Sequence, residues 1–226
     1  MVKRPFKEKT AVKAFCDVQT KPGIIIDRPH ITIISGRKGS GKTHLLCRLL
    51  LTAWKGVYDR IIFVSPTFKS QFDSLWCQLS PEGITVHESL EDSFIENLLQ
   101  SVSSTRHSTL LVMDDIGEDL RRTSPAMLNK LVSNSRHYRL SIVCLHQKLT
   151  QAPTIVRANV DCIVSFPACS FLEREALWRE ISTVDRKTFQ RIFTEATVEE
   201  HSFLVSTIDK GGILRNYASD FSTILL

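Results

Sequence analysis

A glycine-rich segment between an apolar strand and a helix constrains this sequence more than any other feature. Residues 36–43 read GRKGSGKT and match the pattern GxxxxGK[ST]. They follow the β-branched run at residues 31–34 and lead into the apolar helical stretch at residues 43–50. A glycine-rich turn with a chance lysine rarely has both of these neighbours, so the sequence predicts a phosphate-binding loop.

Each residue type in this loop has a physical reason. Glycines let backbone N–H groups converge on an anion, and the N-terminus of the following helix favours negative charge. Lys42 can reach the β and γ oxygens of a nucleoside triphosphate, and Thr43 can offer its hydroxyl to Mg²⁺. ATP and Mg²⁺ are therefore the expected cofactors. The expected contacts are Gly36, Arg37, Lys38, Gly39, Ser40, Gly41, Lys42, Thr43 and His44.

Two adjacent acids follow a third apolar strand, at residues 109–113. We assign Asp114 to Mg²⁺ and Asp115 to the catalytic base, with Glu118 as the alternative base. Two neighbouring carboxylates repel each other unless a cation lies between them, which argues against a purely structural role. We expect these acids to reach the metal from the strand next to that of the loop.

Gln147 follows a fourth apolar strand, at residues 140–145. Its side-chain amide can contact both the γ-phosphate and the attacking water, and so report hydrolysis to the rest of the chain. A polar strand end without a catalytic role is the alternative interpretation.

Three arginines flank the fourth and fifth strands, namely Arg136, Arg139 and Arg157. Any of them can cross a subunit interface to stabilise charge on the transferring phosphoryl group, or form a surface ion pair instead. We favour Arg136, because it lies at the end of a predicted helix, residues 125–138, that leads into the strand carrying Gln147.

Apolar strands alternate with helices through most of the chain, which predicts an α/β fold with a mostly parallel sheet covered by helices on both faces. The strands are expected at residues 31–34, 60–64, 109–113, 140–145 and 160–166, and the helices at residues 43–50, 90–102 and 125–138. Residues 201–208 and 213–217 flank a turn sequence, DKGG, and predict a C-terminal β-hairpin that extends the sheet. We expect a basic segment at residues 1–29 and one ATPase domain at residues 30–226.

Composition limits the remaining possibilities. With 42% hydrophobic and 23% charged residues over 226 positions, the chain is expected to fold as one domain. A net charge of +5 accommodates a polyanionic partner without requiring one. The basic residues of the N-terminal segment, and the expected flexible loop at Arg121 and Arg122, can contact phosphates or remain solvated.

Six single cysteines without a CxxC pair indicate buried thiols in a reducing compartment. Histidines without ligand spacing give no reason for a second metal site. The longest apolar run, residues 45–54, is too short to cross a bilayer, so we expect a soluble intracellular protein without a membrane span.

Three segments together resemble the genome-packaging ATPases of double-jelly-roll DNA viruses, a branch of the FtsK/HerA superfamily that includes the poxvirus-type enzymes. The segments read GRKGSGKTHLL, LLVMDDIGEDL and RHYRLSIVCLHQKLTQAPTIVRANVDCIVSF, and the resemblance covers residues 31–166. It implies a P-loop NTPase of the ASCE, RecA-like type, acting as a homo-oligomeric ring, pentamer or hexamer, with sites shared between neighbours.

The activity implied by the resemblance is ATP-driven translocation of double-stranded DNA, which packages a viral genome into a preformed capsid. Capsid or vertex proteins would be partners, and the host cytoplasm or nucleus, at the site of virion assembly, would be the location. The resemblance also implies Gln147 as the sensor and an arginine finger nearby. It departs at Asp115, where the superfamily usually has glutamate, so hydrolysis can depend on a repositioned water or on Glu118.

Two other functions compete with a motor. One is an AAA-type ATP-dependent loader or switch protein, which normally carries a helical lid where this sequence predicts a hairpin. The other is an ATP-binding capsid-assembly subunit with little turnover, which stimulation of ATPase activity by DNA would distinguish from a motor.

Overall fold

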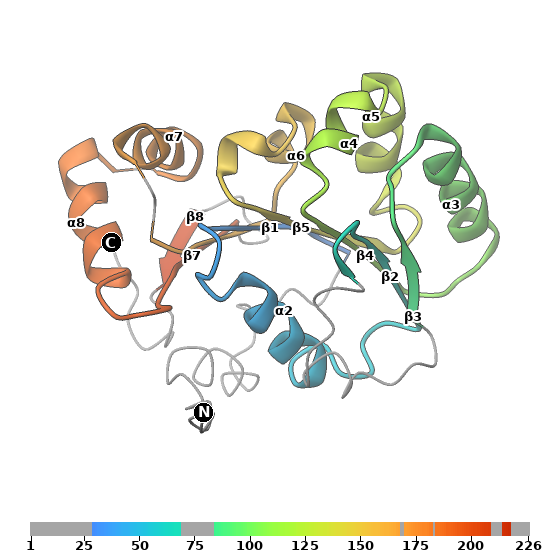
Figure 1. Cartoon of the computed structure of the whole chain (residues 1–226), viewed down its shortest axis with the longest axis horizontal. Coiled ribbons are helices and arrows are strands. Elements are labelled where there is room, and N and C mark those ends of the chain that lie inside the picture. The colour runs from blue at the N-terminus through green and yellow to red at the C-terminus, as the bar shows by residue number, and fades with distance from the viewer. Residues whose placement is uncertain (1–28, 69–83, 168–169, 183, 209–213, 218–226) are drawn as a thin grey trace, which may run out of the picture.

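The computed structural model describes residues 29–68, 84–167, 170–182, 184–208 and 214–217. These residues form one eight-stranded sheet with helices on both faces (Figure 1). The strands are β1 (Ile31–Ser35), β2 (Arg60–Val64), β3 (Ile84–His87), β4 (Thr109–Asp114), β5 (Leu140–His146), β6 (Cys162–Ser165), β7 (Leu204–Ile208) and β8 (Leu214–Tyr217). The expected α/β fold is confirmed, while the basic segment at residues 1–28 lies outside the described residues.

The strand order is β3-β2-β4-β5-β1-β6-β7-β8. All pairings from β3 to β6 are parallel, and β7 and β8 add an antiparallel pair at the β6 side, which confirms the expected hairpin strands. The expectation that the two acids follow a strand next to that of the loop is wrong, because β4, which ends at Asp114, is not next to β1. Strand β5 lies between them and pairs with both, so Gln147 follows a strand placed between the loop and the acids.

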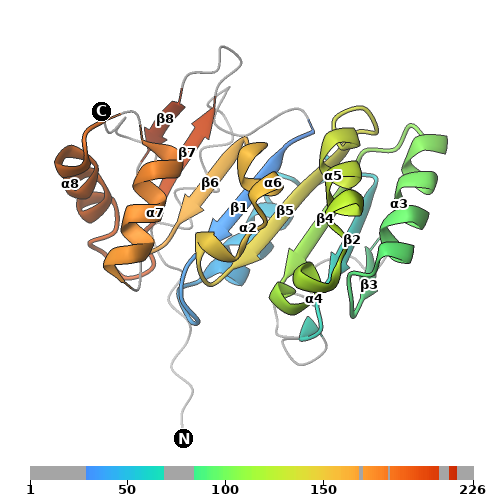
Figure 2. The same cartoon turned by 90° about the horizontal axis from the view of Figure 1, so that it is seen from above.

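Helix α2 (Lys42–Leu51) covers one face of the sheet, and the other described helices cover the opposite face (Figures 1 and 2). These helices are α3 (Asp92–Ser104), α4 (Gly117–Arg122), α5 (Pro125–Asn134), α6 (Thr154–Ala158), α7 (Phe171–Ile181) and α8 (Arg186–Ala196), with a short 3-10 helix, η4 (Leu149–Gln151), between β5 and α6. Each face has its own buried apolar cluster, as expected for strands that are hydrophobic on both sides.

Two local predictions are corrected by the structure. The helix expected at residues 125–138 ends at Asn134, because the amide and the hydroxyl of Ser135 both donate to the Val132 carbonyl, three residues back, which replaces the regular helical pattern. Arg136 therefore lies in the turn between α5 and β5. The loop expected around Arg121 is helical instead, within α4, where the Arg121 guanidinium pairs with the Glu118 carboxylate at 3.0 Å.

The described part of the chain contains no helix with the length and apolar character needed to span a membrane. Three of the six cysteines, Cys47, Cys144 and Cys162, are described; all are buried free thiols, in agreement with the sequence interpretation. The other three lie outside the described residues.

Candidate nucleotide site

The phosphate loop runs from the end of β1 to the start of α2 at the carboxyl edge of the parallel strands. Its first amide, Gly36 N, donates to the His146 carbonyl at 3.1 Å, which fastens the loop to the end of β5. Gly39 and Gly41 have φ of 77° and 106°, values that side-chain-bearing residues rarely adopt. The sequence pattern thus places glycine where the backbone requires it.

Gly36 is needed for a different reason, namely space. A Cβ added at this position would lie 2.6 Å from the Phe166 Cβ and 2.7 Å from the Ser40 Oγ. The first glycine of the motif therefore lets the residue after β6 pack directly against the loop.

Lys42 holds its ammonium group against the loop that precedes it. The Nζ atom donates to the Gly36 carbonyl at 2.6 Å and to the Arg37 carbonyl at 3.1 Å. This position places a positive charge over the loop at the N-terminus of α2, where the helix dipole also favours an anion.

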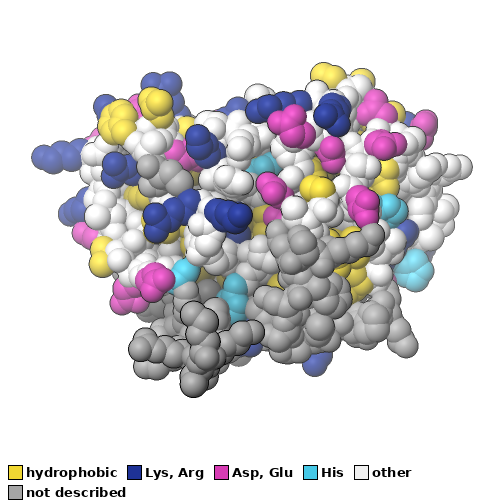
Figure 3. Space-filling view, viewed as in Figure 1, with side chains coloured by type: hydrophobic (Ala, Val, Ile, Leu, Met, Phe, Trp, Pro, Cys, Tyr) yellow, Lys and Arg dark blue, Asp and Glu magenta, His cyan; other side chains and the backbone are white. Residues whose placement is uncertain are grey.

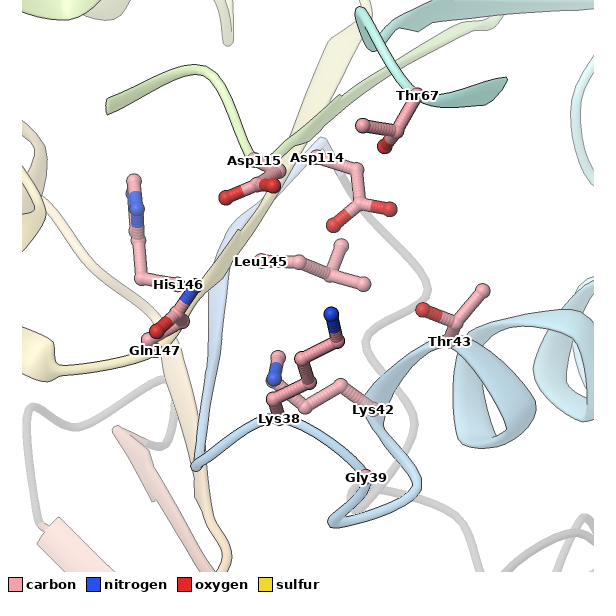
Figure 4. A pocket seen from close by; sticks show the side chains of 10 residues that line it. All are labelled: Lys38, Gly39, Lys42, Thr43, Thr67, Asp114, Asp115, Leu145, His146 and Gln147. Carbon is pink, nitrogen blue, oxygen red and sulfur yellow. The ribbon is translucent and has the colours of Figure 1, made fainter. Parts of the chain in front are cut away.

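A cavity of about 460 Å³ opens in front of the loop (Figure 4). Predicted site residues from three separate segments line it, which brings together the loop, the paired acids and Gln147. The lining residues are Lys38, Gly39, Lys42, Thr43, Thr67, Asp114, Asp115, Leu145, His146 and Gln147.

The Asp114 carboxyl group lies at the end of β4 and is only 8% exposed. Burial, with the neighbouring Asp115 charge, raises its pKa to about 6, although the positive charge of Lys42 lowers it. Burial makes the charged form of a carboxyl group unfavourable, and a nearby cation stabilises that charged form. A metal ion bound beside Asp114 would therefore stabilise its carboxylate charge.

Mg²⁺ fits this arrangement. Figure 4 shows the Thr43 hydroxyl and the Asp114 carboxylate facing each other across the cavity from α2 and β4. No cluster of three or more His, Cys, Asp or Glu side chains that could hold a metal occurs among the described residues. Mg²⁺ in nucleotide sites usually takes one or two protein oxygens and completes its shell with phosphate oxygens and water, so two facing ligands suffice.

Asp115 has an exposed side chain and a backbone φ of 56°, in the left-handed region. This backbone turns the chain sharply after β4, so that consecutive acids serve different parts of the site. Asp115 lines the nucleotide cavity and also a second cavity of about 820 Å³, which extends along α4, η4 and α6. The candidate base is thus within reach of water from two sides.

The loop carrying Gln147 is held in place by two side chains. The amides of Gln147 and Lys148 both donate to the Gln151 Oε1 at 3.1 Å. The next amide, of Leu149, donates to the buried carboxylate of Glu173 on α7. These bonds leave the Gln147 side chain exposed at the cavity on a fixed backbone.

Sequence reasoning missed two polar residues of the cavity, Thr67 and His146. His146 is 4% exposed, and its Nε2 has no hydrogen-bond partner among the described residues. Burial, assisted by the charge of Lys42, lowers the His146 pKa to about 4, so the ring is neutral near pH 7. Its position directly before Gln147 was the available signal, but burial of a strand-end side chain depends on distant segments that pack against it.

Comparison with known proteins identifies the family. The sequence matches the family described as "Poxvirus A32 protein" over residues 23–205, which is most of the chain. This chain belongs to the poxvirus A32 protein family. The poxvirus-type resemblance noted in the sequence is thereby confirmed.

Curated relatives of this A32-family chain come from poxviruses and from an invertebrate iridescent virus. It is 28% identical over 150 residues to the "DNA packaging protein OPG160" of vaccinia virus (strain Western Reserve), an alignment that covers 63% of this chain and 54% of the relative. It is 25% identical over 140 residues to the "Uncharacterized protein 075L" of Invertebrate iridescent virus 6, covering 59% and 53%. The chain thus spans about half the length of the curated relatives it matches.

Solved structures share the fold of the A32-family chain. The genome packaging NTPase B204 of Sulfolobus turreted icosahedral virus 2, in complex with AMP, superimposes with a TM-score of 0.62 at 21% identity, over 85% of this chain and 98% of that chain. B204 of Sulfolobus turreted icosahedral virus, described as a DNA-packaging ATPase, gives a TM-score of 0.63 at 18% identity, over 84% and 98%. At these sequence identities, the structural similarity shows that the proteins share a fold.

None of the three candidate arginines of this A32-family chain lines its own nucleotide cavity. Arg136 pairs with the buried Asp161, which also accepts the Ile31 amide at the start of β1. Arg139 donates to the Arg106 carbonyl at 3.2 Å. These contacts lie at the amino edge of the strands, opposite the phosphate loop.

Arg157 lies elsewhere, on α6 beside the second cavity. It pairs with Glu180 of α7 and donates from Nε to the Ala152 carbonyl at 3.2 Å. With a side chain that is 20% exposed and held by partners within the chain, Arg157 is the least available of the three for a neighbouring subunit.

Proposed function

We propose that this chain is an ATP-hydrolysing motor that translocates double-stranded DNA and packages a viral genome into a preformed capsid. The observation that carries the proposal is the convergence of Lys42, Asp114 and Gln147 on one cavity from three segments of the chain. The similarity to a DNA packaging protein of vaccinia virus and to a genome packaging NTPase of Sulfolobus turreted icosahedral virus 2 supports DNA as the substrate.

The proposed chemistry assigns one task to each residue. The loop amides and Lys42 would bind the phosphates of ATP, while Thr43 and Asp114 would hold Mg²⁺, which would supply positive charge against the phosphate oxygens. Asp115 accepts the proton of the attacking water, and Gln147 orients that water against the γ-phosphate. Glu118 is the weaker candidate base, because it pairs with Arg121 and lines the second cavity without lining the one in front of the loop.

A ring of subunits is proposed because the phosphate loop and Arg136 lie at opposite edges of the sheet. A head-to-tail contact between copies would bring the amino edge of one subunit to the carboxyl edge of the next. The Arg136 side chain is 56% exposed despite its ion pair, so it remains accessible to a neighbour. In this arrangement Arg136 acts as the arginine finger for the adjacent site, in a pentamer or hexamer.

Duplex DNA would contact a basic part of the surface. Figure 3 shows many lysine and arginine side chains over α7, α8 and the centre of this face, whereas acidic side chains are more frequent over α3 to α5, where basic ones also occur. The exposed basic residues of α7 and α8 are Arg174, Arg179, Arg186, Lys187 and Arg191. Such residues bind the phosphate backbone regardless of sequence, as genome packaging requires. Capsid or vertex proteins are the further proposed partners, at the site of virion assembly in the host cytoplasm or nucleus.

The deciding experiment measures ATP hydrolysis with and without duplex DNA over a range of protein concentrations. We expect hydrolysis that rises with DNA and with assembly, and that is lost in Lys42→Ala. Charge reversal at Lys187 and Arg191 should reduce stimulation by DNA while leaving basal hydrolysis intact. Slow turnover that does not respond to DNA would favour the capsid-assembly subunit instead.

A further inference from the structure

His201 lies against the phosphate loop although it follows that loop by about 160 residues. It belongs to the turn between α8 and β7, and its side chain is only 12% exposed. Its Nδ1 lies 2.7 Å from the Ser40 carbonyl oxygen. The same nitrogen would be 3.3 Å from a Cβ at Gly41, so the ring approaches the loop where glycine leaves room.

Both ring nitrogens of His201 face acceptor oxygens. Nδ1 faces the Ser40 carbonyl, and Nε2 lies 2.8 Å from the Glu200 Oε1. A carbonyl oxygen can only accept, so Nδ1 is the donor in the contact with the loop.

The backbone of His201 has a φ of 66°, in the left-handed region. Residues with a side chain seldom adopt this conformation unless the surrounding structure holds them there, and such residues cluster at functional sites. The strained backbone of His201 directs its ring onto the Ser40 carbonyl.

The contact fixes the orientation of one peptide group. The described residues contain no cis peptide bond, so the Ser40–Gly41 unit is trans and planar. Its carbonyl points toward His201, and the N–H of Gly41 therefore points the opposite way, into the loop. Converging N–H groups of this kind bind phosphate in glycine-rich loops.

The same segment supports the loop at a second point. The Phe203 ring packs on Phe166, with ring centroids 5.1 Å apart, and the Phe166 Cβ occupies the space beside Gly36. The turn before β7 thus contacts the start of the loop through Phe166, on which Phe203 packs, and the end of the loop through His201.

We propose that His201 is a positioning residue for the phosphate loop, whose ring holds the Ser40–Gly41 peptide in the orientation that binds phosphate. Through this contact the turn between α8 and β7 sets the affinity of the site for nucleotide. The inference depends on the proposed function, because it requires that the loop binds a nucleoside triphosphate.

The test compares the affinity for ATPγS with Mg²⁺, measured by calorimetry, with the melting temperature of the nucleotide-free protein. His201→Gly removes the ring and relieves the backbone strain, so we expect ATPγS binding at least tenfold weaker with the melting temperature retained or raised. His201→Asn keeps a donor and tolerates positive φ, so part of the affinity should return. Arg139→Gly is the matched control, because Arg139 also has positive φ, 53°, but lies at the opposite edge of the sheet.

Equal ATPγS affinity in the wild type and in His201→Gly would overturn the positioning role and leave the proposed function intact. Weaker binding in His201→Gly with no recovery in His201→Asn and the same loss in Arg139→Gly would also overturn it, since the loss would then be nonspecific. Failure of the wild type to bind ATPγS would instead contradict the proposed function, and this inference with it.

Discussion

The Arg136 guanidinium donates to the Asp161 carboxylate at 2.7 Å, at the amino edge of the sheet and therefore at the opposite edge from the phosphate loop. Asp161 is 3% exposed and also accepts the backbone amide of Ile31, the first residue of β1. The ion pair thus anchors the start of the strand whose end carries the loop. Arg136 has a structural partner in its own subunit, and it can serve a nucleotide site only in another.

We expect Arg136→Ala to lower the free energy of unfolding by about 1–3 kcal/mol, since a buried carboxylate loses a charged donor. Urea denaturation of the monomer measures this. Arg139→Ala is the control, because Arg139 lies in the same turn but donates only to a backbone carbonyl. Equal stability of Arg136→Ala and the wild type would show that water replaces the guanidinium without cost.

A mixing experiment separates the interface role of Arg136 from this structural role. Lys42→Ala and Arg136→Ala are each expected to have little ATPase activity alone. In an equal mixture, about a quarter of the head-to-tail interfaces join an intact Lys42 site to an intact Arg136, so activity should return. No recovery in mixed rings, once their assembly is verified, would exclude Arg136 as the arginine finger.

Asp114→Asn should stabilise the nucleotide-free protein at neutral pH. The folded-state pKa of Asp114, about 6, lies above the ordinary value of 3.8, so the buried carboxylate costs free energy. That cost appears as the pH rises from 4 to 6 and is complete above the folded pKa. We expect Asp114→Asn to gain on the order of 2 kcal/mol at pH 7.5 and nothing near pH 4.

The same substitution should remove the stabilisation that Mg²⁺ and ATP give to the wild type, because a metal ligand is lost. Thermal melts at pH 4 to 8, with and without Mg²⁺ and ATP, measure both effects. A nucleotide-free Asp114→Asn protein that melts below the wild type at pH 7.5 would contradict the electrostatic account of this site.

The predicted site residues that the structure brings together at one cavity each follow from a local pattern. The loop, the paired acids and Gln147 all come directly after apolar strands, and parallel strands bring their carboxyl ends to one edge. The place of β5 between β1 and β4 was missed, because strand order depends on contacts between distant segments. The same limit hides the contact of His201 with Ser40, which joins residues 161 positions apart.

Helix α4 was not predicted either, although its sequence contains a helix signal. The segment GEDLRR has acids in its first turn and arginines in its last, the charge distribution that a helix dipole favours. The prediction of a flexible loop at Arg121 and Arg122 considered their positive charge alone and not the order of acidic and basic residues along the segment. Glu118, the alternative base, is consequently held by Arg121 within this helix.

Asp115→Asn should separate catalysis from binding. Asn tolerates the left-handed backbone found at this position, so the turn after β4 should be preserved. We expect kcat to fall by roughly 10²-fold or more, the usual effect of losing a general base, with ATP binding retained. Glu118→Gln serves as the comparison and should change kcat little. A larger loss in Glu118→Gln than in Asp115→Asn would reverse the assignment of the base.

Gly36→Ala and Gly39→Ala should damage the loop for different reasons. At Gly36 the new Cβ would lie 2.6 Å from the Phe166 Cβ, an atom attached to the backbone that cannot rotate away. At Gly39 nothing lies within 4 Å, but the φ of 77° strains any side-chain-bearing residue. We expect a cost of about 1–3 kcal/mol in stability at Gly36 and about 1 kcal/mol at Gly39.

A second substitution distinguishes these two causes. The Gly36 methyl group would also meet the Ser40 Oγ at 2.7 Å, and Ser40→Gly removes that oxygen. Ser40→Gly should therefore restore part of the stability lost in Gly36→Ala, and none of that lost in Gly39→Ala. The measurement compares the melting temperatures of the two single glycine variants with that of the wild type, and those of the two double variants with that of Ser40→Gly. Equal recovery in both double variants would mean that Ser40→Gly acts by loosening the loop, and that crowding at Gly36 is not the cause.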